Sequence, residues 1–147
     1  VGRNGKNFRI VKFRTMVKNA EAQGAVFATT NDARVTPFGR FLRRTRLDEV
    51  PQFVNVLCGE MAVIGPRPER QVFVDQIAAQ MPFYQTRHVI KPGLTGWAQV
   101  NYSYGDSLDD SLMKLQYDLY YIKHRSIFLD LNIIIKTLST VLFFRGQ

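Results

Sequence analysis

The sequence predicts a compact α+β domain that is mostly helical and carries a small β-hairpin near its N-terminus. The chain has 147 residues, of which 46% are hydrophobic, and this is enough for one domain with its own core. Apolar and basic residues alternate near the N-terminus, as in a half-buried strand. Most other apolar residues recur at the spacing of amphipathic helices. We therefore expect residues 1–147 to form a single domain.

The hairpin is predicted at the start of the chain. Apolar and basic residues alternate over residues 7–16, and the preceding Asn4-Gly5 pair is a turn signal. A short helix is expected to follow over residues 17–23 and to end at Gly24.

Two helices are predicted between residues 36 and 59. Thr36 suits an N-cap and Pro37 a first turn, so the first helix should begin there. The second should begin at Asp48, hold Pro51 in its first turn and stop near Gly59. Their apolar residues are Phe38, Phe41, Leu42, Phe53, Val54 and Leu57.

The next segments continue this helical pattern. A helix should start near Pro68 and end before Pro82, whereas residues 91–105 hold three glycines and are predicted to be largely irregular. Ser107 with Asp110 resembles a capping box at the start of a long amphipathic helix.

The last segment, residues 127–145, is strongly apolar but is interrupted by charged and polar residues, so it is a poor membrane span. Two interpretations stay open: a buried core helix, or an amphipathic helix that lies in a membrane interface. Its predicted apolar face holds Leu131, Ile134, Leu138 and Leu142.

The charge is unevenly distributed. Residues 1–46 hold eleven Lys and Arg against two acids, whereas residues 47–147 hold nine against ten. This basic third indicates an anionic partner, which could be nucleic acid, an anionic membrane or the phosphates of a small substrate, or else a solvated basic surface. The lone Cys58 cannot form an internal disulfide, which suits a reducing compartment.

Asp48 and Glu49 stand side by side directly after a cluster of arginines. Acidic residues at a helix start commonly serve as a cap and complement the helix dipole. Two carboxylates there can also hold Mg²⁺, which bridges to phosphates, and a carboxylate beside cations stays ionised and can attack phosphorus. The pair alone does not decide between these roles.

Four stretches in order make the sequence resemble the bacterial sugar transferase family, whose members are polyprenyl-phosphate sugar-1-phosphate transferases, or monotopic phosphoglycosyl transferases. The resemblance covers nearly the whole chain. The stretches are KFRTM (12–16), RLDEVPQFVNVLCGEMAVIGPRP (46–68), KPGLTGWAQVN (91–101) and YDLYYIKHRSIFLDL (117–131).

The resemblance implies transfer of a sugar-1-phosphate from a UDP-sugar to a polyprenyl phosphate, with release of UMP, as the first step of exopolysaccharide or glycan assembly. It implies that Asp48 is the nucleophile, forming a phosphosugar-aspartyl intermediate, and that Asp48 and Glu49 bind Mg²⁺. The residues that it implies for substrate or phosphate binding are Lys12, Arg14, Arg46, Pro66, Arg67, Pro68, Gln99, Asn101 and Asp118.

The sequence departs from the family pattern in two places. Many members follow WAQVN with Gly-Arg, but Tyr102 and Ser103 stand here, so Arg87 or another basic residue is a candidate substitute. The family also places a re-entrant membrane helix just before the point where this chain begins. The NYSYG and KLQYDLYYIKH stretches are similar to the subgroup associated with exopolysaccharide clusters and exosortase systems.

We therefore expect an enzyme at the cytoplasmic face of the bacterial inner membrane, with a membrane surface but no nucleic acid among its partners. Two alternatives remain open. One is a basic nucleic-acid-binding module, because basic residues interleave with phenylalanines in the first third. The other is an inactive scaffold of the same fold, because of the missing arginine.

Overall fold

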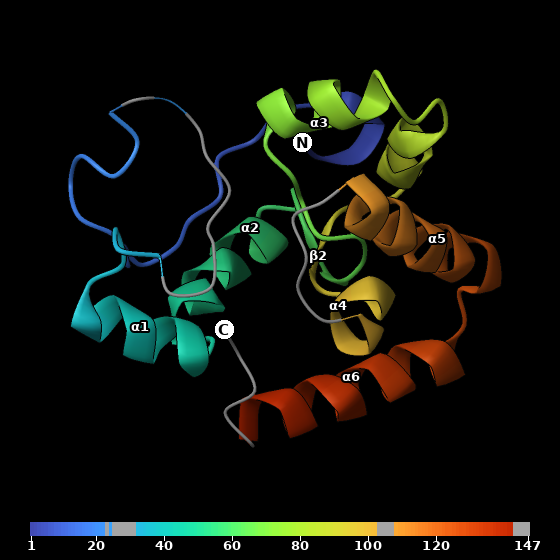
Figure 1. Cartoon of the computed structure of the whole chain (residues 1–147). Helices are drawn as coiled ribbons and strands as arrows, with labels where there is room; N and C mark the ends of the chain where they lie inside the picture. The colour runs from blue at the N-terminus through green and yellow to red at the C-terminus, as the bar shows by residue number, and fades with distance from the viewer. Residues whose placement is uncertain (23, 25–31, 103–107, 143–147) are drawn as a thin grey trace.

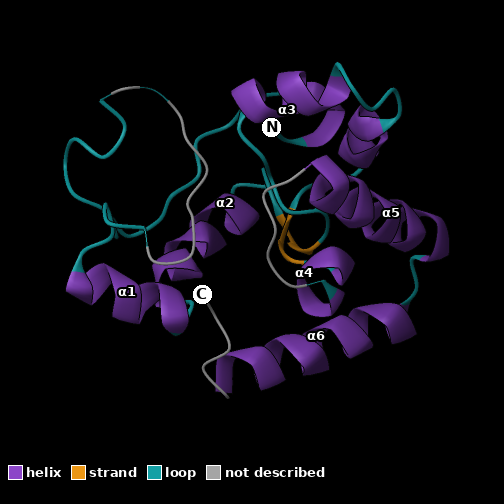
Figure 2. Ribbon diagram, viewed as in Figure 1, coloured by secondary structure: helices purple, strands orange, loops and turns teal. Residues whose placement is uncertain are grey.

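The computed structural model describes residues 1–22, 24, 32–102 and 108–142, and it is mostly helical around a short central sheet (Figures 1 and 2). The predicted α+β class is confirmed. In chain order, with η for a 3₁₀ helix, the elements are η1 (Arg3–Gly5), α1 (Pro37–Arg44), η2 (Leu47–Gln52), α2 (Phe53–Leu57), β1 (Ala62–Ile64), α3 (Gln71–Ala78), η3 (Tyr84–Val89), β2 (Gly93–Thr95), α4 (Trp97–Asn101), α5 (Leu108–His124) and α6 (Ile127–Leu142).

The sheet consists of β1 and β2, which run parallel and pair Ala62 with Gly93 and Ile64 with Thr95. The prediction that residues 91–105 are largely irregular was wrong for β2 and α4. β2 and α4 are too short for a periodic pattern of apolar residues to be recognised in the sequence. The parallel pairing requires a crossover, which α3 and η3 provide.

The two strands approach each other closely at Gly65 and Gly93. A Cβ atom on Gly93 would lie 2.1 Å from the backbone nitrogen of Gly65. We expect Gly93→Ala to lower the free energy of unfolding by about 1–3 kcal/mol, because backbone cannot yield as a flexible side chain can. Chemical denaturation measures this, with Val63→Ala on the exposed side of β1 as the control. Equal effects of the two substitutions would contradict the close approach.

The predicted N-terminal hairpin was wrong. The Asn4-Gly5 turn forms, with φ of 56° and 74°, but residues 7–15 form no strand. An isolated antiparallel bridge joins Met16 to Val35. We call residues 9–16 the N-terminal segment; its backbone bonds to η2 and α2, far along the sequence, instead of to a neighbouring strand.

The helix boundaries predicted from capping signals agree better with the structure. The Thr36 hydroxyl accepts the N–H of Gly39 at 2.9 Å, and Pro37 is the first residue of α1, as predicted. The helix predicted over residues 17–23 is replaced by turns over residues 18–22. The predicted cap residue Ser107 lies outside the described residues.

The main apolar core lies between α3, η3 and α5, in the upper right part of Figure 1. Its most buried member is Val74, which is 1% exposed. The cluster consists of Val1, Val74, Met81, Tyr84 and Leu115, with Ile77, Ala78 and Leu119 packed against it.

α6 does not bury its predicted apolar face. Leu131 and Leu138 are 52% and 56% exposed, whereas Ile133 is fully buried against the body of the domain. On this inner side, the hydroxyls of Thr137 and Thr95 are 2.7 Å apart and link α6 to β2. The structure therefore does not support the buried-core interpretation of this helix.

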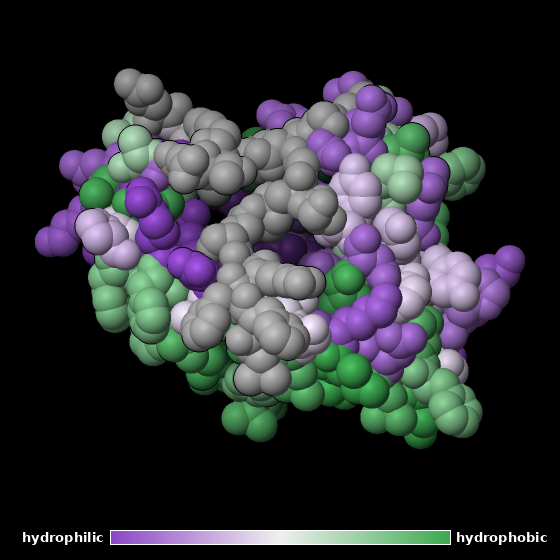
Figure 3. Space-filling model, turned by 60° about the horizontal axis from the view of Figure 1, so that its bottom comes forward, coloured by the Kyte–Doolittle hydropathy of each residue, from purple (hydrophilic) through white to green (hydrophobic). Residues whose placement is uncertain are grey.

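The helical stretch from η2 to α2 is amphipathic, but its polar face is buried and its apolar face is exposed. Asp48, Gln52 and Asn55 are buried, whereas apolar residues between them face outward. Figure 3 shows hydrophobic surface running along the lower side of the molecule from the region of α1 to α6. We define the apolar face as the exposed side chains Phe38, Phe41, Leu47, Val50, Phe53, Val54, Leu57, Ile127, Phe128, Leu131, Ile135 and Leu138.

Candidate active site

η2 presents two adjacent carboxylates, Asp48 and Glu49, in its first turn. Arg46 precedes them in the left-handed backbone conformation, with φ of 59°, which redirects the chain after α1. Pro51 has no N–H to offer the carbonyl of Asp48, and this carbonyl accepts the N–H of Phe13 at 3.1 Å. The predicted helix start is thus confirmed in position, although its first turns are 3₁₀ rather than α-helical.

Asp48 is only 9% exposed, and its Oδ1 atom is buried without a hydrogen-bond partner among the described residues. Burial and the neighbouring Glu49 raise the pKa of Asp48, although the charges of Lys12, Arg43 and Arg46 act in the opposite direction. A buried carboxylate oxygen without a donor is costly unless a cation or a reacting group contacts it. The geometry therefore favours a chemical role for this atom over a capping role.

Glu49 has different surroundings. Its Oε1 accepts a hydrogen bond from Nη2 of Arg67 at 2.6 Å and lies 3.8 Å from Nη1 of Arg46. Burial acts to raise the pKa of Glu49, but the charge and hydrogen bond of Arg67 outweigh it and lower the pKa. Environments that move two neighbouring carboxyl pKa values in opposite directions are typical of sites in which the groups have different roles.

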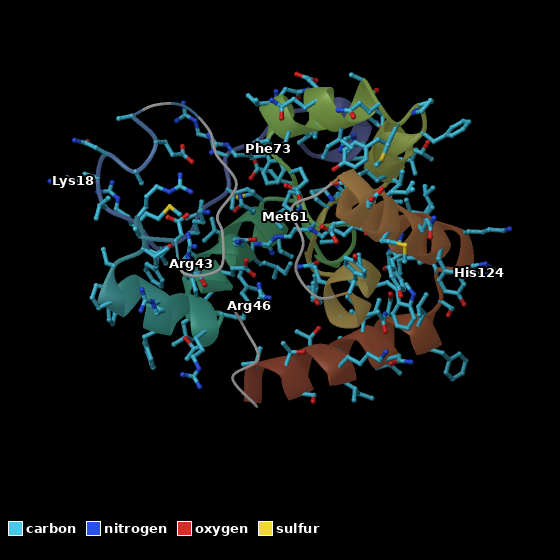
Figure 4. The ribbon with its side chains drawn as sticks, in the orientation of Figure 1. Lys18, Arg43, Arg46, Met61, Phe73 and His124 are labelled. Atoms are coloured by element: carbon cyan, nitrogen blue, oxygen red, sulfur yellow. The ribbon has the colours of Figure 1, made fainter. Side chains whose placement is uncertain are left out.

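The N-terminal segment and α1 bring further cations to the pair. The N–H of Phe13 donates to the carbonyl of Asp48 at 3.1 Å, so the adjacent Lys12 extends from backbone that contacts η2, and its charge acts to lower the pKa of both carboxyl groups. Figure 4 shows Arg43 and Arg46 on the side of the molecule near α1 and α2, away from His124. The Arg14 side chain is exposed, and its role in phosphate binding stays a prediction.

The turn after β1 places Arg67 at the carboxylates. Pro66 is buried, and its carbonyl accepts the N–H of Gly93 at 2.9 Å, which fixes the turn to β2. Pro68 is half-buried on the other side of Arg67. Of these three predicted residues, Arg67 therefore reaches the site with its side chain, and the prolines shape its backbone.

Gln99 and Asn101 on α4 bond elsewhere. The Gln99 amide nitrogen donates to the carbonyl of Leu94 at 3.1 Å, and its Oε1 is buried without a partner among the described residues. The Asn101 amide donates to the carbonyl of Trp97 at 2.8 Å and accepts from Lys136 of α6. No hydrogen bond joins either amide to the two carboxylates in the part of the chain that the structure describes, and their substrate contacts stay predictions.

Asp118 lies in the interior rather than beside the carboxylates of η2. It is 2% exposed and accepts hydrogen bonds from Nε and Nη2 of Arg87 at 3.0 and 2.7 Å. Burial lowers the pKa of Arg87, but the adjacent Asp118 carboxylate more than offsets this and raises it. Arg87 also donates to the hydroxyl of Tyr84 and to the carbonyl of Arg67. The candidate substitute for the missing arginine is thus engaged in an ion pair that supports the Arg67 turn.

Sequence reasoning missed Asn55, which is 2% exposed and bonds to the N-terminal segment. A signal for it exists. Asp48, Gln52 and Asn55 recur at the spacing of one helical face within an otherwise apolar stretch. Polar residues at that spacing indicate a buried polar face, as the structure shows.

Asp48 and Glu49 are also the residues that could hold Mg²⁺. Within the described ranges no group of three or more His, Cys, Asp or Glu residues is arranged to hold a metal ion. Mg²⁺ is commonly bound by one or two carboxylates together with water and substrate phosphates, so two carboxylates are sufficient. The unpartnered Oδ1 of Asp48 fits such an ion.

Comparison with known proteins places this site in a family. Residues 1–144 match the family described as Bacterial sugar transferase. The "UDP-N-acetylgalactosamine-undecaprenyl-phosphate N-acetylgalactosaminephosphotransferase" of Aeromonas hydrophila is 50% identical over 142 residues, which cover 97% of this chain and 34% of that protein. The "UDP-glucose:undecaprenyl-phosphate glucose-1-phosphate transferase" of Escherichia coli (strain K12) is 43% identical over 138 residues, covering 92% of this chain and 30% of that protein.

A shorter relative shows the same similarity. The "Uncharacterized sugar transferase EpsL" of Bacillus subtilis (strain 168) is 37% identical over 145 residues, covering 99% of this chain and 68% of that protein. The chain spans about a third of the length of the first two relatives. Because the family match extends over nearly every residue, this chain belongs to the bacterial sugar transferase family.

Proposed function

We propose that this chain is the catalytic domain of a phosphoglycosyl transferase, which moves a sugar-1-phosphate from a UDP-sugar to a polyprenyl phosphate and releases UMP. The observation that carries the proposal is the buried, unpartnered Oδ1 of Asp48 beside Glu49. The family membership and the substrates in the names of the relatives support the same reaction class. The product would begin exopolysaccharide or glycan assembly.

In the first half-reaction, an Asp48 oxygen attacks the phosphorus that bears the sugar, and the bond to the oxygen of the departing UMP breaks. The polyprenyl phosphate then attacks the same phosphorus, which breaks the bond to Asp48 and restores its carboxylate. Nη1 of Arg46 lies 3.8 Å from Oε1 of Glu49, and Lys12 adjoins the backbone contact of Phe13 with Asp48, so both cations are available to offset negative charge on the phosphates. Mg²⁺, when bound by Asp48 and Glu49, supplies further neutralisation of phosphate charge.

The test is a UMP-release assay on the full-length protein in detergent or nanodiscs. It uses Mg²⁺ and a panel of UDP-sugars, with and without undecaprenyl phosphate. We expect multiple turnovers with one or more UDP-sugars only when the lipid phosphate is present. Absence of UMP release with every UDP-sugar would overturn the proposal and favour the inactive scaffold.

The nucleic-acid-binding alternative is not favoured. The proposed reaction gives the basic N-terminal third a use, because Lys12 and Arg46 are the side chains that we propose to bind substrate phosphates. A nucleic-acid module would instead bind oligonucleotides in a strongly salt-dependent manner and leave Asp48 and Glu49 unexplained.

The membrane partner is proposed from the apolar face. No helix among the described residues is long and apolar enough to cross a membrane. The face nevertheless exposes large side chains such as Phe128 (83%) and Leu57 (88%), with Arg40 and Arg44 exposed on α1. Exposed apolar patches beside basic residues are typical of surfaces that rest in the headgroup region of an anionic membrane. We place this surface at the cytoplasmic face of the inner membrane, where both proposed substrates can meet.

Charged substitutions on the apolar face are expected to weaken membrane binding. Ile135 is 66% exposed on α6, and Ile135→Glu should reduce the fraction of this chain bound to anionic liposomes by about tenfold, since burial of such a side chain contributes about 1.5–3 kcal/mol. Flotation of liposomes measures the bound fraction. Asn132→Glu adds the same charge beside the face and is the control. Equal loss in both variants would contradict insertion of the face.

A further inference from the structure

The Asn55 side chain joins α2 to the N-terminal segment through both of its polar atoms. Its Oδ1 accepts the N–H of Val11 at 3.0 Å, and its Nδ2 donates to the carbonyl of Arg9 at 2.8 Å. Nδ2 also donates to Oε2 of Glu60 at 2.7 Å, which fixes the orientation of the amide. Asn55 is only 2% exposed, so water competes little for these hydrogen bonds and their geometry is well defined.

These bonds lie on both sides of Lys12 in the sequence. Asn55 holds residues 9 and 11, and the carbonyl of Asp48 holds the N–H of Phe13. Lys12 lies between these anchors, and its charge acts on Asp48 and Glu49. The Lys12 side chain is long and exposed, so its position depends on the backbone from which it extends.

We propose that Asn55 is a positioning residue, which fixes the backbone of the N-terminal segment so that the Lys12 ammonium stays at the Asp48–Glu49 pair. The inference rests on the proposed function, because it assigns Asn55 a part in the same reaction. A positioning role differs from a purely structural role in one respect: Asn55 affects the rate of transfer only by placing Lys12.

A double-mutant cycle separates these two roles. UMP release by full-length protein in nanodiscs is measured for the wild type, Asn55→Ala, Lys12→Met and the double variant. Lys12→Met should lower kcat/KM for the UDP-sugar by about 10²-fold, as expected for loss of a preorganised charge. Asn55→Ala should lower it by about tenfold or more, because misplacement of a group by about 1 Å has effects of this size. The double variant should be no slower than Lys12→Met alone.

Lys18→Met is the matched control, because it removes the same charge from an exposed side chain outside the N-terminal segment, at the outer edge of the molecule (Figure 4). Combined with Asn55→Ala, it should leave the Asn55 effect unchanged. The melting temperature is measured for every variant, and only those with Asn55→Ala should melt lower. If Asn55→Ala does not fold, Asn55→Ser, which keeps a small hydrogen-bonding side chain, takes its place in the cycle.

The outcomes are distinguishable. If the wild type releases UMP and the losses from Asn55→Ala and Lys12→Met multiply in the double variant, Asn55 acts on folding alone and the inference is wrong. If the wild type releases no UMP with any UDP-sugar, the proposed function itself has failed. A double variant that matches Lys12→Met while its melting temperature matches Asn55→Ala supports the positioning role.

Discussion

Asp48→Asn is expected to abolish lipid-dependent UMP release, with a loss of at least about 10³-fold, while the fold stays intact. The amide has nearly the same size and fits the same buried position, but it cannot form the acyl phosphate that would join Asp48 to the phosphosugar. The control is Asp75→Asn, a matched change at an exposed position on α3, which should leave turnover unchanged. Full turnover by Asp48→Asn would remove the nucleophile role assigned to this residue.

The same variant has an expected effect on stability. Burial and Glu49 raise the pKa of Asp48, so its charged form is less favourable in the folded than in the unfolded chain. Above the folded pKa both states are ionised, and the wild type then carries the full free-energy penalty for burying the charged carboxylate. This loss of folding free energy shrinks as the pH falls through the pKa of Asp48 in the folded chain. It vanishes below the pKa of Asp in the unfolded chain, which is about 3.9.

Without Mg²⁺, Asp48→Asn should therefore unfold at a higher denaturant concentration than the wild type at pH 7, and the difference should disappear on acidification. Denaturation in EDTA at several pH values measures this. A variant that is less stable than the wild type at pH 7 would show that the Asp48 carboxylate stabilises the fold instead.

The largest expected effect on stability belongs to the interior pair of Arg87 and Asp118. Asp118→Ala leaves the Arg87 guanidinium, which is 5% exposed, without its carboxylate. Breaking one partner of a buried pair costs about 3–5 kcal/mol, which corresponds to a decrease of about 10 °C in the melting temperature of a domain of this size. Thermal unfolding of the purified protein measures the change.

Replacing both partners is the control for this prediction. Arg87→Met with Asp118→Leu removes both charges together, so it should lose much less stability than Asp118→Ala. The double variant also lacks the bond from Arg87 to the carbonyl of Arg67, and it should therefore transfer more slowly than its stability alone suggests. If Asp118→Ala is as stable as the wild type, Arg87 and Asp118 do not form a buried ion pair as in the structure.

Local signals in the sequence predicted part of this structure well. Thr36 and Pro37 begin α1 as expected, because a cap bond and a fixed φ involve only adjacent residues. The position of the Asp48–Glu49 turn could also be predicted, because the arginines and Pro51 lie beside it in sequence. The contact of Arg67 with Glu49 was not predicted, because 18 residues separate them and no local pattern joins them.

Tertiary contacts account for what the sequence did not predict. The alternation over residues 7–16 indicated a hairpin, but its backbone partners are Asn55 and the carbonyl of Asp48, which no local pattern reveals. The ion pair of Asp118 with Arg87, 31 residues away, was not predicted either, and the part of Asp118 in substrate binding stays a prediction. The apolar stripe of α6 predicts a buried face equally well as an exposed one, since periodicity does not identify what covers a face.

The most direct test of the account is the intact mass of the full-length protein after incubation with Mg²⁺ and the UDP-sugar that supports UMP release, without any lipid acceptor. A covalent role of Asp48 predicts an increase equal to one phosphosugar, absent in Asp48→Asn and lost when undecaprenyl phosphate is added. An unchanged mass in a protein that releases UMP in the presence of lipid would contradict the covalent role of Asp48 and indicate direct transfer between the two substrates.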